Sequence, residues 1–462
     1  MNLKDDKQQN IQMQLAFSSA LTGEAREAGR EETESSGAMN GTENPASTNR
    51  LMEEVCEREN LKAALQRVKA NKGSPGVDGM TVIGIKEYLK QHWPAIREQL
   101  LSGTYEPKPV RRVEIAKPDG GVRKLGIPTV LDRFIQQAVM QVLQRRWDRT
   151  FSDYSYGFRP GRSAQQAVAQ AQQYIAEGHG WCVDLDLEKF FDRVNHDKLM
   201  GRVARRVEDK RLWKLIRAFL NAGVMEDGLV SPSVEGTPQG GPRSPLLSNL
   251  VLDELDRELE RRGPRFVRYA DDSNLYVRSE RAGQRVMESV KRFITEKLKL
   301  KVNESNSAVA KPQERKFLGF SFTGGKELKR KIAPKAIDRF QERIREITQK
   351  GRGRSMKKVM EELARYVRGW RGDFGFCETP SVLRRLDAWV RRRVRCAFWR
   401  QWKTGRKRFA ELVRRGVSRE LAASTAGSRC GPWHVSQSQA LDRALSNAYL
   451  SSFGLPSLVE GR

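Results

Sequence analysis

Two adjacent carboxylates, Asp271 and Asp272, interrupt an alternating apolar stretch at residues 266–277. This pattern predicts a strand, a tight turn that carries both acids, and a second strand. Because strands normally exclude Asp, a turn that presents both carboxylates at one edge of a sheet suggests that their negative charge is used. Divalent metal binding is one use, since Mg²⁺ prefers carboxylate oxygens and two such ions can assist a phosphoryl transfer. A solvated hairpin turn explains the pair equally well.

A second pair of acids, Asp184 and Asp186, alternates with apolar residues at 181–187. A strand at this place would put both acids on one face. Like-charged neighbours repel, so they either raise a pKa or recruit a cation, and a shared metal site would explain why this segment faces the 271/272 turn. Taken alone, the segment is better explained as the polar outer face of an edge strand.

Six segments between residues 110 and 325 resemble, in the same order, the sequence blocks of reverse transcriptases. Their finger blocks are those of group II intron reverse transcriptases, or maturases. The six segments are Leu125–Arg133, Tyr156–Ser163, Asp186–Asp192, Glu235–Asn249, Tyr269–Asp272 and Phe317–Phe320. Residues 433–436, 447–449 and 454–458 resemble the tails of the short, class C-like bacterial type, which lacks the HNH endonuclease domain.

The resemblance implies an α+β fold, the right-hand polymerase fold. It consists of fingers, a palm with an antiparallel sheet, a helical thumb, and a small basic C-terminal domain. We expect fingers and palm over residues 51–325, the thumb or maturase X domain over 326–390, and a basic nucleic-acid-binding segment over 391–462. Residues 1–50 are rich in polar residues and poor in large apolar ones, which predicts a disordered leader.

The resemblance also assigns the catalytic residues. It implies that Asp186, Asp271 and Asp272 are both the catalytic residues and the metal ligands, holding two Mg²⁺ ions, with Mn²⁺ as an alternative, for nucleotidyl transfer. Asp184 is then a neighbour with a structural role. The choice of Asp186 over Asp184 comes from the family spacing to the aromatic pair that follows, because the alternation alone does not decide between them.

Four further residues are expected at the incoming nucleotide. Residues 117–123 form a Gly-containing turn between two cations, a shape suited to phosphate, although a basic hairpin is the default for a basic protein. The resemblance implies that Lys117 and Arg123 contact the triphosphate. It places the ring of Phe191 under the sugar, where it would exclude a 2′-hydroxyl, and Gln239 beside the nucleotide and primer. An ordinary turn residue explains Gln239 equally well on local grounds.

Two positions depart from the family pattern. Asn306 stands where the family usually has a Lys that is thought to donate a proton toward the pyrophosphate. An amide does not titrate, so polymerisation is expected to be slower, although positioning and metal ions supply most of the catalysis in such transfers. Arg243 stands where the family usually has Leu, which either disturbs packing at a helix start or points to RNA.

Basic charge is concentrated toward the C-terminus. The chain has a formal net charge of +28, and 33 Lys and Arg stand against 13 Asp and Glu after residue 325. Such a gradient is typical of a surface that binds a polyanion. Residues 380–402 predict a helix with Thr379 as its cap and Pro380 at its first position.

One face of that predicted helix carries five cations. They are Arg384, Arg385, Arg391, Arg392 and Arg395. A solvated charged face is the usual explanation of such a pattern. Because acids are almost absent from this face, we expect RNA phosphates to relieve the repulsion among its cations.

The resulting expectation is an RNA-directed DNA polymerase encoded by a group II intron, which also binds its intron RNA to promote splicing and retromobility. Its partners would be the group II intron RNA, an RNA template with a DNA primer, dNTPs and target DNA. No apolar run approaches the roughly 20 residues that span a bilayer, so no membrane is expected. The expected location is the bacterial cytoplasm, with nucleoid association on DNA.

Three alternatives stay open. Asn306 is compatible with a splicing-only maturase whose polymerase is weakened. A retron or diversity-generating reverse transcriptase is an enzyme of different biology, against which the finger blocks and the long basic tail argue. A plain RNA-binding protein is the non-enzymatic alternative.

Overall fold

A computed structural model describes residues 49–116, 122–226, 229–231, 236, 241–242, 244–325, 327–349 and 353–459. The chain forms two compact units, which are divided between Lys311 and Pro312. Apart from its last two residues, the expected leader lies outside the described residues. Arg243 also lies outside them.

The central sheet of the N-terminal unit contains four antiparallel strands in the order β6-β7-β3-β8. They are β3 (Trp181–Leu185), β6 (Arg265–Tyr269), β7 (Asp272–Val277) and β8 (Ala308–Ala310). Val183 and Val277 contribute to the hydrophobic core from one face of this sheet. Helix α10 packs closely on that face, since a Cβ at Gly283 would lie 2.5 Å from a methyl carbon of Val309. The alternation predicted for residues 181–187 therefore buries the apolar face.

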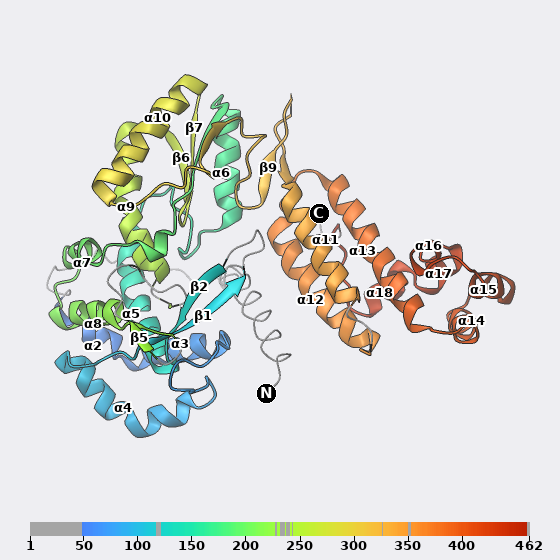
Figure 1. The fold of residues 1–462 in the computed structure, drawn as a ribbon, viewed down its shortest axis with the longest axis horizontal. Helices are drawn as coiled ribbons and strands as arrows, with labels where there is room; N and C mark the ends of the chain where they lie inside the picture. The colour runs from blue at the N-terminus through green and yellow to red at the C-terminus, as the bar shows by residue number, and fades with distance from the viewer. Residues whose placement is uncertain are drawn as a thin grey trace, which may run out of the picture. The chain divides into compact units, whose positions relative to one another are not determined.

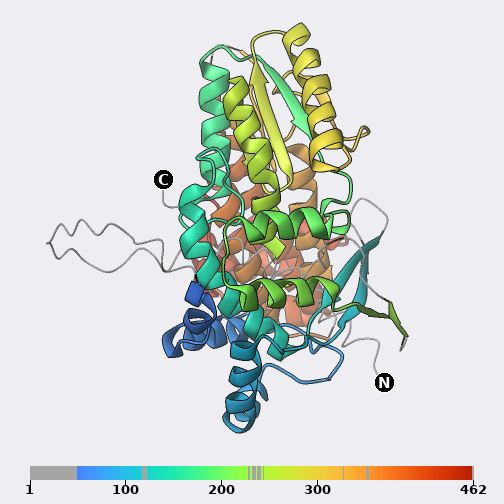
Figure 2. The same ribbon diagram turned by 90° about the vertical axis from the view of Figure 1, so that its left-hand side faces the viewer.

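Helices run alongside the strands of the central sheet (Figure 2). They are α6 (Ala164–Ala176), α9 (Ser244–Arg262) and α10 (Glu280–Phe293). Helix α6 begins at a capping box, in which Ser163 and Gln166 bond each other's backbone N–H groups. Helix α10 continues into a π-helical turn at Ile294–Leu298.

A second sheet of the same unit has the strand order β2-β1-β4-β5. Its strands are β1 (Val110–Ala116), β2 (Val122–Ile127), β4 (Val224–Glu226) and β5 (Leu229–Ser231). The β1–β4 pair is parallel and the other two pairs are antiparallel.

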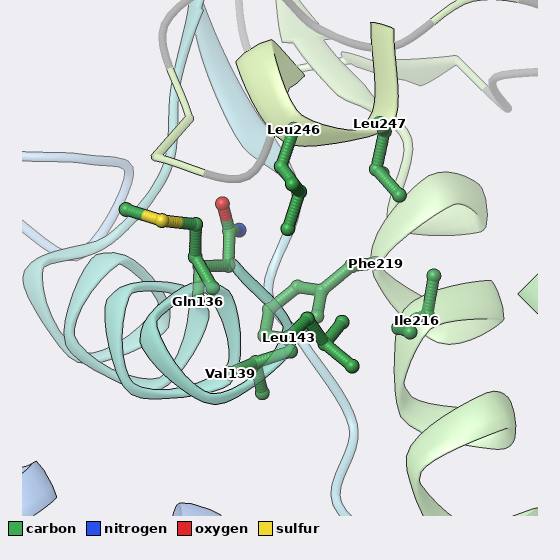
Figure 3. A pocket seen from close by; sticks show the side chains of 8 residues that line it. Gln136, Val139, Leu143, Ile216, Phe219, Leu246 and Leu247 are labelled. Atoms are coloured by element: carbon green, nitrogen blue, oxygen red, sulfur yellow. The ribbon is translucent and has the colours of Figure 1, made fainter. Parts of the chain in front are cut away.

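The other helices of this unit complete its core. They are α2 (Leu51–Val55), α3 (Arg58–Ala70), α4 (Ile85–Ser102), α5 (Val130–Trp147), α7 (His196–Ala204) and α8 (Lys210–Asn221), with 3-10 turns at Asp148–Thr150 and Phe190–Asp192. A small apolar cavity lies among α5, α8 and α9 (Figure 3), where Val139 and Leu143 of α5 approach Phe219 of α8. Its volume of about 10 Å³ is close to that of one water molecule, so it is a packing gap rather than a ligand site.

The C-terminal unit is mainly helical (Figure 1). A hairpin of β9 (Phe320–Phe322) and β10 (Arg330–Ile332) precedes three long helices, α11 (Pro334–Gln349), α12 (Met356–Phe374) and α13 (Pro380–Gln401). Helix α11 packs against both α12 and α13. Five shorter helices follow: α14 (Gly405–Arg414), α15 (Arg419–Ala426), α16 (Pro432–Val435), α17 (Gln439–Ala444) and α18 (Asn447–Ser452).

The α+β class is confirmed, whereas the division of the chain differs from the expected boundaries. The hairpin β9–β10 belongs to the C-terminal unit because the ring of Phe320 packs on Phe374 and Phe376, at centroid distances of 5.4 and 6.5 Å. Helix α13 runs without a break through the expected boundary at residues 390 and 391. Within the described residues, no helix combines the length and apolar character that crossing a membrane requires.

Candidate active site

The predicted strand, turn and strand are confirmed at the end of the central sheet, but the turn carries only Asp271, because Asp272 is the first residue of β7. Tyr269 pairs with Asp272, so Ala270 and Asp271 form a two-residue turn between β6 and β7. Ala270 has a φ of 57°, a conformation that two-residue turns usually give to glycine. Gly157 packs directly against this turn, since a Cβ at Gly157 would lie 2.3 Å from the Ala270 nitrogen.

The strand register brings the three expected catalytic acids to one sheet edge. Strand β3 pairs with β7 through Leu185 and Ser273. Continuing this register by one residue places Asp186 opposite Asp272, next to Asp271 in the turn. Asp272 is exposed, and Asp186 and Asp271 are half-buried.

Asp184 lies farther back on the same face. It pairs with Asn274 of β7. When the Asn274 amide is oriented to donate, its nitrogen lies 3.1 Å from Oδ1 of Asp184. This hydrogen bond is the kind of structural role that was expected for Asp184.

Asp186 is held by the segment that leads into β8. Its Oδ2 accepts hydrogen bonds from the side-chain amides of Asn303, at 2.9 Å, and Asn306, at 2.8 Å. Its backbone N–H donates to the Ser307 hydroxyl at 3.0 Å, and its carbonyl accepts from the Asn303 N–H at 2.8 Å. Asn306, which departs from the family pattern, therefore contacts the expected catalytic carboxylate directly. No local sequence signal pointed to Asn303 or to this contact.

The three carboxylates have the donor chemistry of a hard-cation site, because Mg²⁺ prefers carboxylate oxygens. Among the described residues, however, no group of three or more His, Cys, Asp or Glu side chains is close enough to hold a metal ion. Asp186, Asp271 and Asp272 thus share an edge without converging on one point. Their role as metal ligands stays a prediction.

Of the four residues expected to contact the incoming nucleotide, the structure describes Phe191 in full and Arg123 in part. Lys117 and Gln239 lie outside the described residues, and Arg123 is placed by its backbone alone, on β2 opposite Ile115. Phe191 is half-buried in the 3-10 turn after β3, with its ring edge-on to Phe190 at a centroid distance of 5.2 Å.

Gly236 packs against the backbone of Phe191 and Asp192. It has a φ of 87°, and a Cβ at this position would lie 2.9 Å from the carbonyl oxygens of both Phe191 and Asp192. The Gly236 N–H donates to the Val194 carbonyl at 2.9 Å, and its own carbonyl lies 2.5 Å from Nε2 of the buried His196. Sequence reasoning did not find His196, because its contact lies 40 residues away along the chain.

Sequence profiles of two known families match the chain. Residues 115–322 match the reverse transcriptase (RNA-dependent DNA polymerase) family, and residues 337–416 match the maturase-specific domain of group II introns. The chain thus joins a reverse transcriptase domain to a group II intron maturase-specific domain. Its fold is accordingly the right-hand polymerase fold that the sequence blocks indicated.

Similar proteins occur in bacteria and plants. Protein YkfC of Escherichia coli (strain K12) is 39% identical over 219 residues, which are 46% of this chain and 58% of YkfC. The group II intron-encoded protein LtrA of Lactococcus lactis subsp. cremoris is 39% identical over 197 residues, 42% of this chain and 32% of LtrA. Nuclear intron maturase 4, mitochondrial, of Arabidopsis thaliana is 30% identical over 168 residues, 36% of this chain and 21% of that protein. The chain thus spans less than two thirds of each relative.

The basic helix within the maturase-specific match requires a correction. Helix α13 begins at Pro380 as predicted, and Arg384 and Arg385 are exposed. Arg391 is buried: its Nε lies 2.7 Å from a carboxylate oxygen of Asp387. The expectation that this Arg faces RNA is therefore wrong.

The two remaining cations of that face are also engaged within the chain. Arg392 stacks on Trp433, with its guanidinium carbon 3.8 Å from the ring centroid, and donates to the Trp433 carbonyl. Arg395 pairs with Asp442 at 2.7 Å and donates to the Leu445 carbonyl at 3.0 Å. The repulsion among these cations is thus relieved by acids, carbonyls and an aromatic ring rather than by RNA alone.

Proposed function

We propose that this chain is an RNA-directed DNA polymerase encoded by a group II intron, which also binds its intron RNA to promote splicing and retromobility. The observation that carries the polymerase half is the sheet edge that bears Asp186, Asp271 and Asp272 inside the reverse transcriptase match. Its substrates are an RNA template with a DNA primer and dNTPs.

In this reaction the primer 3′-hydroxyl attacks the α-phosphate of a nucleotide, and charge develops on the phosphoryl oxygens and the leaving pyrophosphate. Two Mg²⁺ ions, or Mn²⁺, bound by Asp186, Asp271 and Asp272 would stabilise that charge and activate the hydroxyl. The β3–β7 register, continued by one residue, brings the backbone of Asp186 opposite that of Asp272. Among the described contacts of the Asp186 carboxylate, both amide bonds fall on Oδ2, which leaves Oδ1 to face a cation.

Nucleotide selection is assigned to the surroundings of Phe191. Its ring would lie under the sugar and exclude a 2′-hydroxyl, which favours dNTPs. The close approach of Gly236 to the Phe191 carbonyl supports this assignment, because Gly236 belongs to the block Glu235–Asn249. Lys117 and Arg123 would bind the triphosphate, and Gln239 would lie at the nucleotide and primer.

Primer extension tests the polymerase half. Wild-type protein with an RNA template, a DNA primer, dNTPs and Mg²⁺ should extend the primer. Asp271→Ala should reduce the rate by about 100-fold or more, because it removes a carboxylate that acts on the developing charge. The matched control is Asp197→Ala, which removes an acid on α7 whose side chain is 82% exposed, and it should keep the wild-type rate. Equal extension by wild type and Asp271→Ala would refute the polymerase proposal.

The maturase half is supported by the match over residues 337–416, which contains the exposed Arg384 and Arg385 of α13. Exposed guanidinium groups suit phosphate contacts in the intron RNA, and in target DNA during mobility. Such contacts make affinity depend on salt concentration, because each one releases condensed counterions.

The salt dependence of intron RNA binding tests these contacts. Affinity falls as salt rises, so the slope of log affinity against log salt is negative. The double variant Arg384→Ala/Arg385→Ala should make this slope shallower by about one for each phosphate that the two side chains bind in the wild type. Arg261→Ala, an exposed Arg paired with Glu258 in the N-terminal unit, is the control and should leave the slope unchanged. An unchanged slope in the double variant would remove both residues from the interface. Intron RNA binding without any primer extension by the wild type would instead favour a splicing-only maturase or a plain RNA-binding protein.

A further inference from the structure

A guanidinium lies fully buried behind the acid-bearing turn. Arg268 of β6 and Asp256 of α9 both have side chains with 0% exposure, and their closest charged atoms are 2.5 Å apart. Burial raises the pKa of the Asp256 carboxyl, and the positive charge of Arg268 opposes that rise. A buried ion pair is costly unless its remaining hydrogen-bonding groups are also satisfied.

Arg268 satisfies this condition completely, because each of its five N–H donors has an acceptor. Nε and one N–H of Nη2 donate to the two carboxylate oxygens of Asp256, at 2.7 and 2.5 Å. The other N–H of Nη2 donates to the Ser155 hydroxyl at 2.7 Å. Nη1 donates to Oδ1 of Asn249 at 3.0 Å and to the carbonyl of Ala270 at 2.8 Å.

The last of these bonds links the guanidinium to the turn. Ala270 is the residue with positive φ, and it directly precedes Asp271. Asn249 makes a second link, since its Nδ2 donates at 2.8 Å to the carbonyl of Gly157, the residue that packs on the Ala270 nitrogen. The Ala270 carbonyl is thus hydrogen-bonded to Arg268, and the Ala270 nitrogen is packed against Gly157. Both contacts belong to one network that is anchored in α9 through Asn249 and Asp256.

The backbone of Arg268 extends the same network. Its N–H donates to the Tyr154 carbonyl at 2.9 Å, and its carbonyl accepts from the Tyr156 N–H at 2.8 Å. Residues 154–157 therefore run beside β6 and reach the turn together with it. Such an arrangement fixes a backbone that would otherwise relax from an unfavourable conformation.

We propose that Arg268 is a positioning residue, whose buried guanidinium fixes the Ala270 carbonyl and thereby aims the carboxylates of Asp271 and Asp272. It does not touch the substrate itself. Its importance for catalysis rests on the proposed polymerase function, whereas its hold on the turn does not. Small displacements of catalytic groups reduce rates strongly, so the loss of this hold should affect turnover more than substrate binding.

The chain contains a matched control for this proposal. Arg202 also forms a bidentate ion pair with an acid of α9, at 2.9 and 2.7 Å to the two carboxylate oxygens of Glu254. Its side chain is 10% exposed. Its described hydrogen bonds go to Glu254 and not to the turn. Arg268→Lys and Arg202→Lys therefore both lose a bidentate pair, but only the first also loses the geometry at Ala270.

Hydrogen exchange of the folded, full-length protein tests the hold on the turn. Arg268→Lys should speed amide exchange in the peptide covering residues 266–277 by about tenfold or more, and Arg202→Lys should change it by less than about threefold. If Arg268→Lys does not fold, Asn249→Ala, which keeps the ion pair with Asp256, should give the same local change. Wild-type exchange in this peptide for the folded variants would overturn the proposal.

Single-nucleotide primer extension, run well below every variant's melting temperature, tests the consequence. Arg268→Lys should lower kcat by about tenfold or more with the KM for dNTP changed by less than about threefold, whereas Arg202→Lys should keep both values near wild type. An equal loss of kcat in the two variants would show that Arg268 only stabilises the fold, and would overturn its positioning role. If the wild type extends nothing while the turn peptide of Arg268→Lys exchanges faster, the polymerase proposal fails and the hold on the turn is confirmed.

Discussion

At the scale of single residues, Asn306 stands out because it donates to Oδ2 of Asp186 at 2.8 Å. An amide cannot titrate, so at this position it can orient a carboxylate but cannot supply a proton. The strands that carry the acids were predictable from the apolar alternation, whereas the choice of Asp186 over Asp184 came from the family resemblance. The contact with Asn306 was not predictable, because 120 residues separate the partners and only the return of the chain through β8 brings them together.

Removing this amide tests its role in orienting Asp186. Asn306→Ala should raise the Mg²⁺ concentration for half-maximal primer extension by about three- to tenfold, because a hydrogen bond to a charged group is worth about 1.5–3 kcal/mol and Asn306 is exposed. Its melting temperature should stay close to that of the wild type. Glu304→Ala, an exposed neighbour, is the control. Identical Mg²⁺ dependence in wild type and Asn306→Ala would show that the contact has no part in cation binding.

At the scale of elements, local signals predicted the β6–β7 hairpin and helix α13 well, because turn acids and Pro380 at a helix start act within a few residues. The function of one helix face was harder to predict. Arg392 and Arg395 find their partners in Trp433 and Asp442, far along the chain, and a helical projection cannot show such partners. Asp387 lies only four residues from Arg391 and pairs with it. The larger number of cations on the same face nevertheless led to the prediction that Arg391 contacts RNA.

Two arginines of α13 should therefore behave in opposite ways. Arg391→Ala should lower the free energy of unfolding of the C-terminal unit by about 2–4 kcal/mol, because it leaves the Asp387 carboxylate without its buried partner. Arg385→Ala, at an exposed position, should change it by about 0.5 kcal/mol or less. Thermal melts and hydrogen exchange of the two full-length variants measure the difference. Equal stability of the two variants would contradict the buried role of Arg391.

At the scale of the whole molecule, the chain combines a reverse transcriptase match and a maturase-specific match in two compact units. Block order along the sequence was enough to predict this combination. The unit boundary was not predictable from it, because the aromatic packing of Phe320 assigns the β9–β10 hairpin to the C-terminal unit. Nor did the strand register predict that the three acids share an edge without converging on one point, since that depends on side-chain positions that the register does not set.

The most direct test of the central claim compares two activities in one preparation. Primer extension on an RNA template and intron RNA binding should be measured in parallel for wild type and Asp186→Ala. We expect Asp186→Ala to lose extension by about 100-fold or more while its Kd for intron RNA stays within about twofold, because the acid edge serves only nucleotidyl transfer. Extension at the wild-type rate by Asp186→Ala would contradict the claim that this sheet edge is the active site.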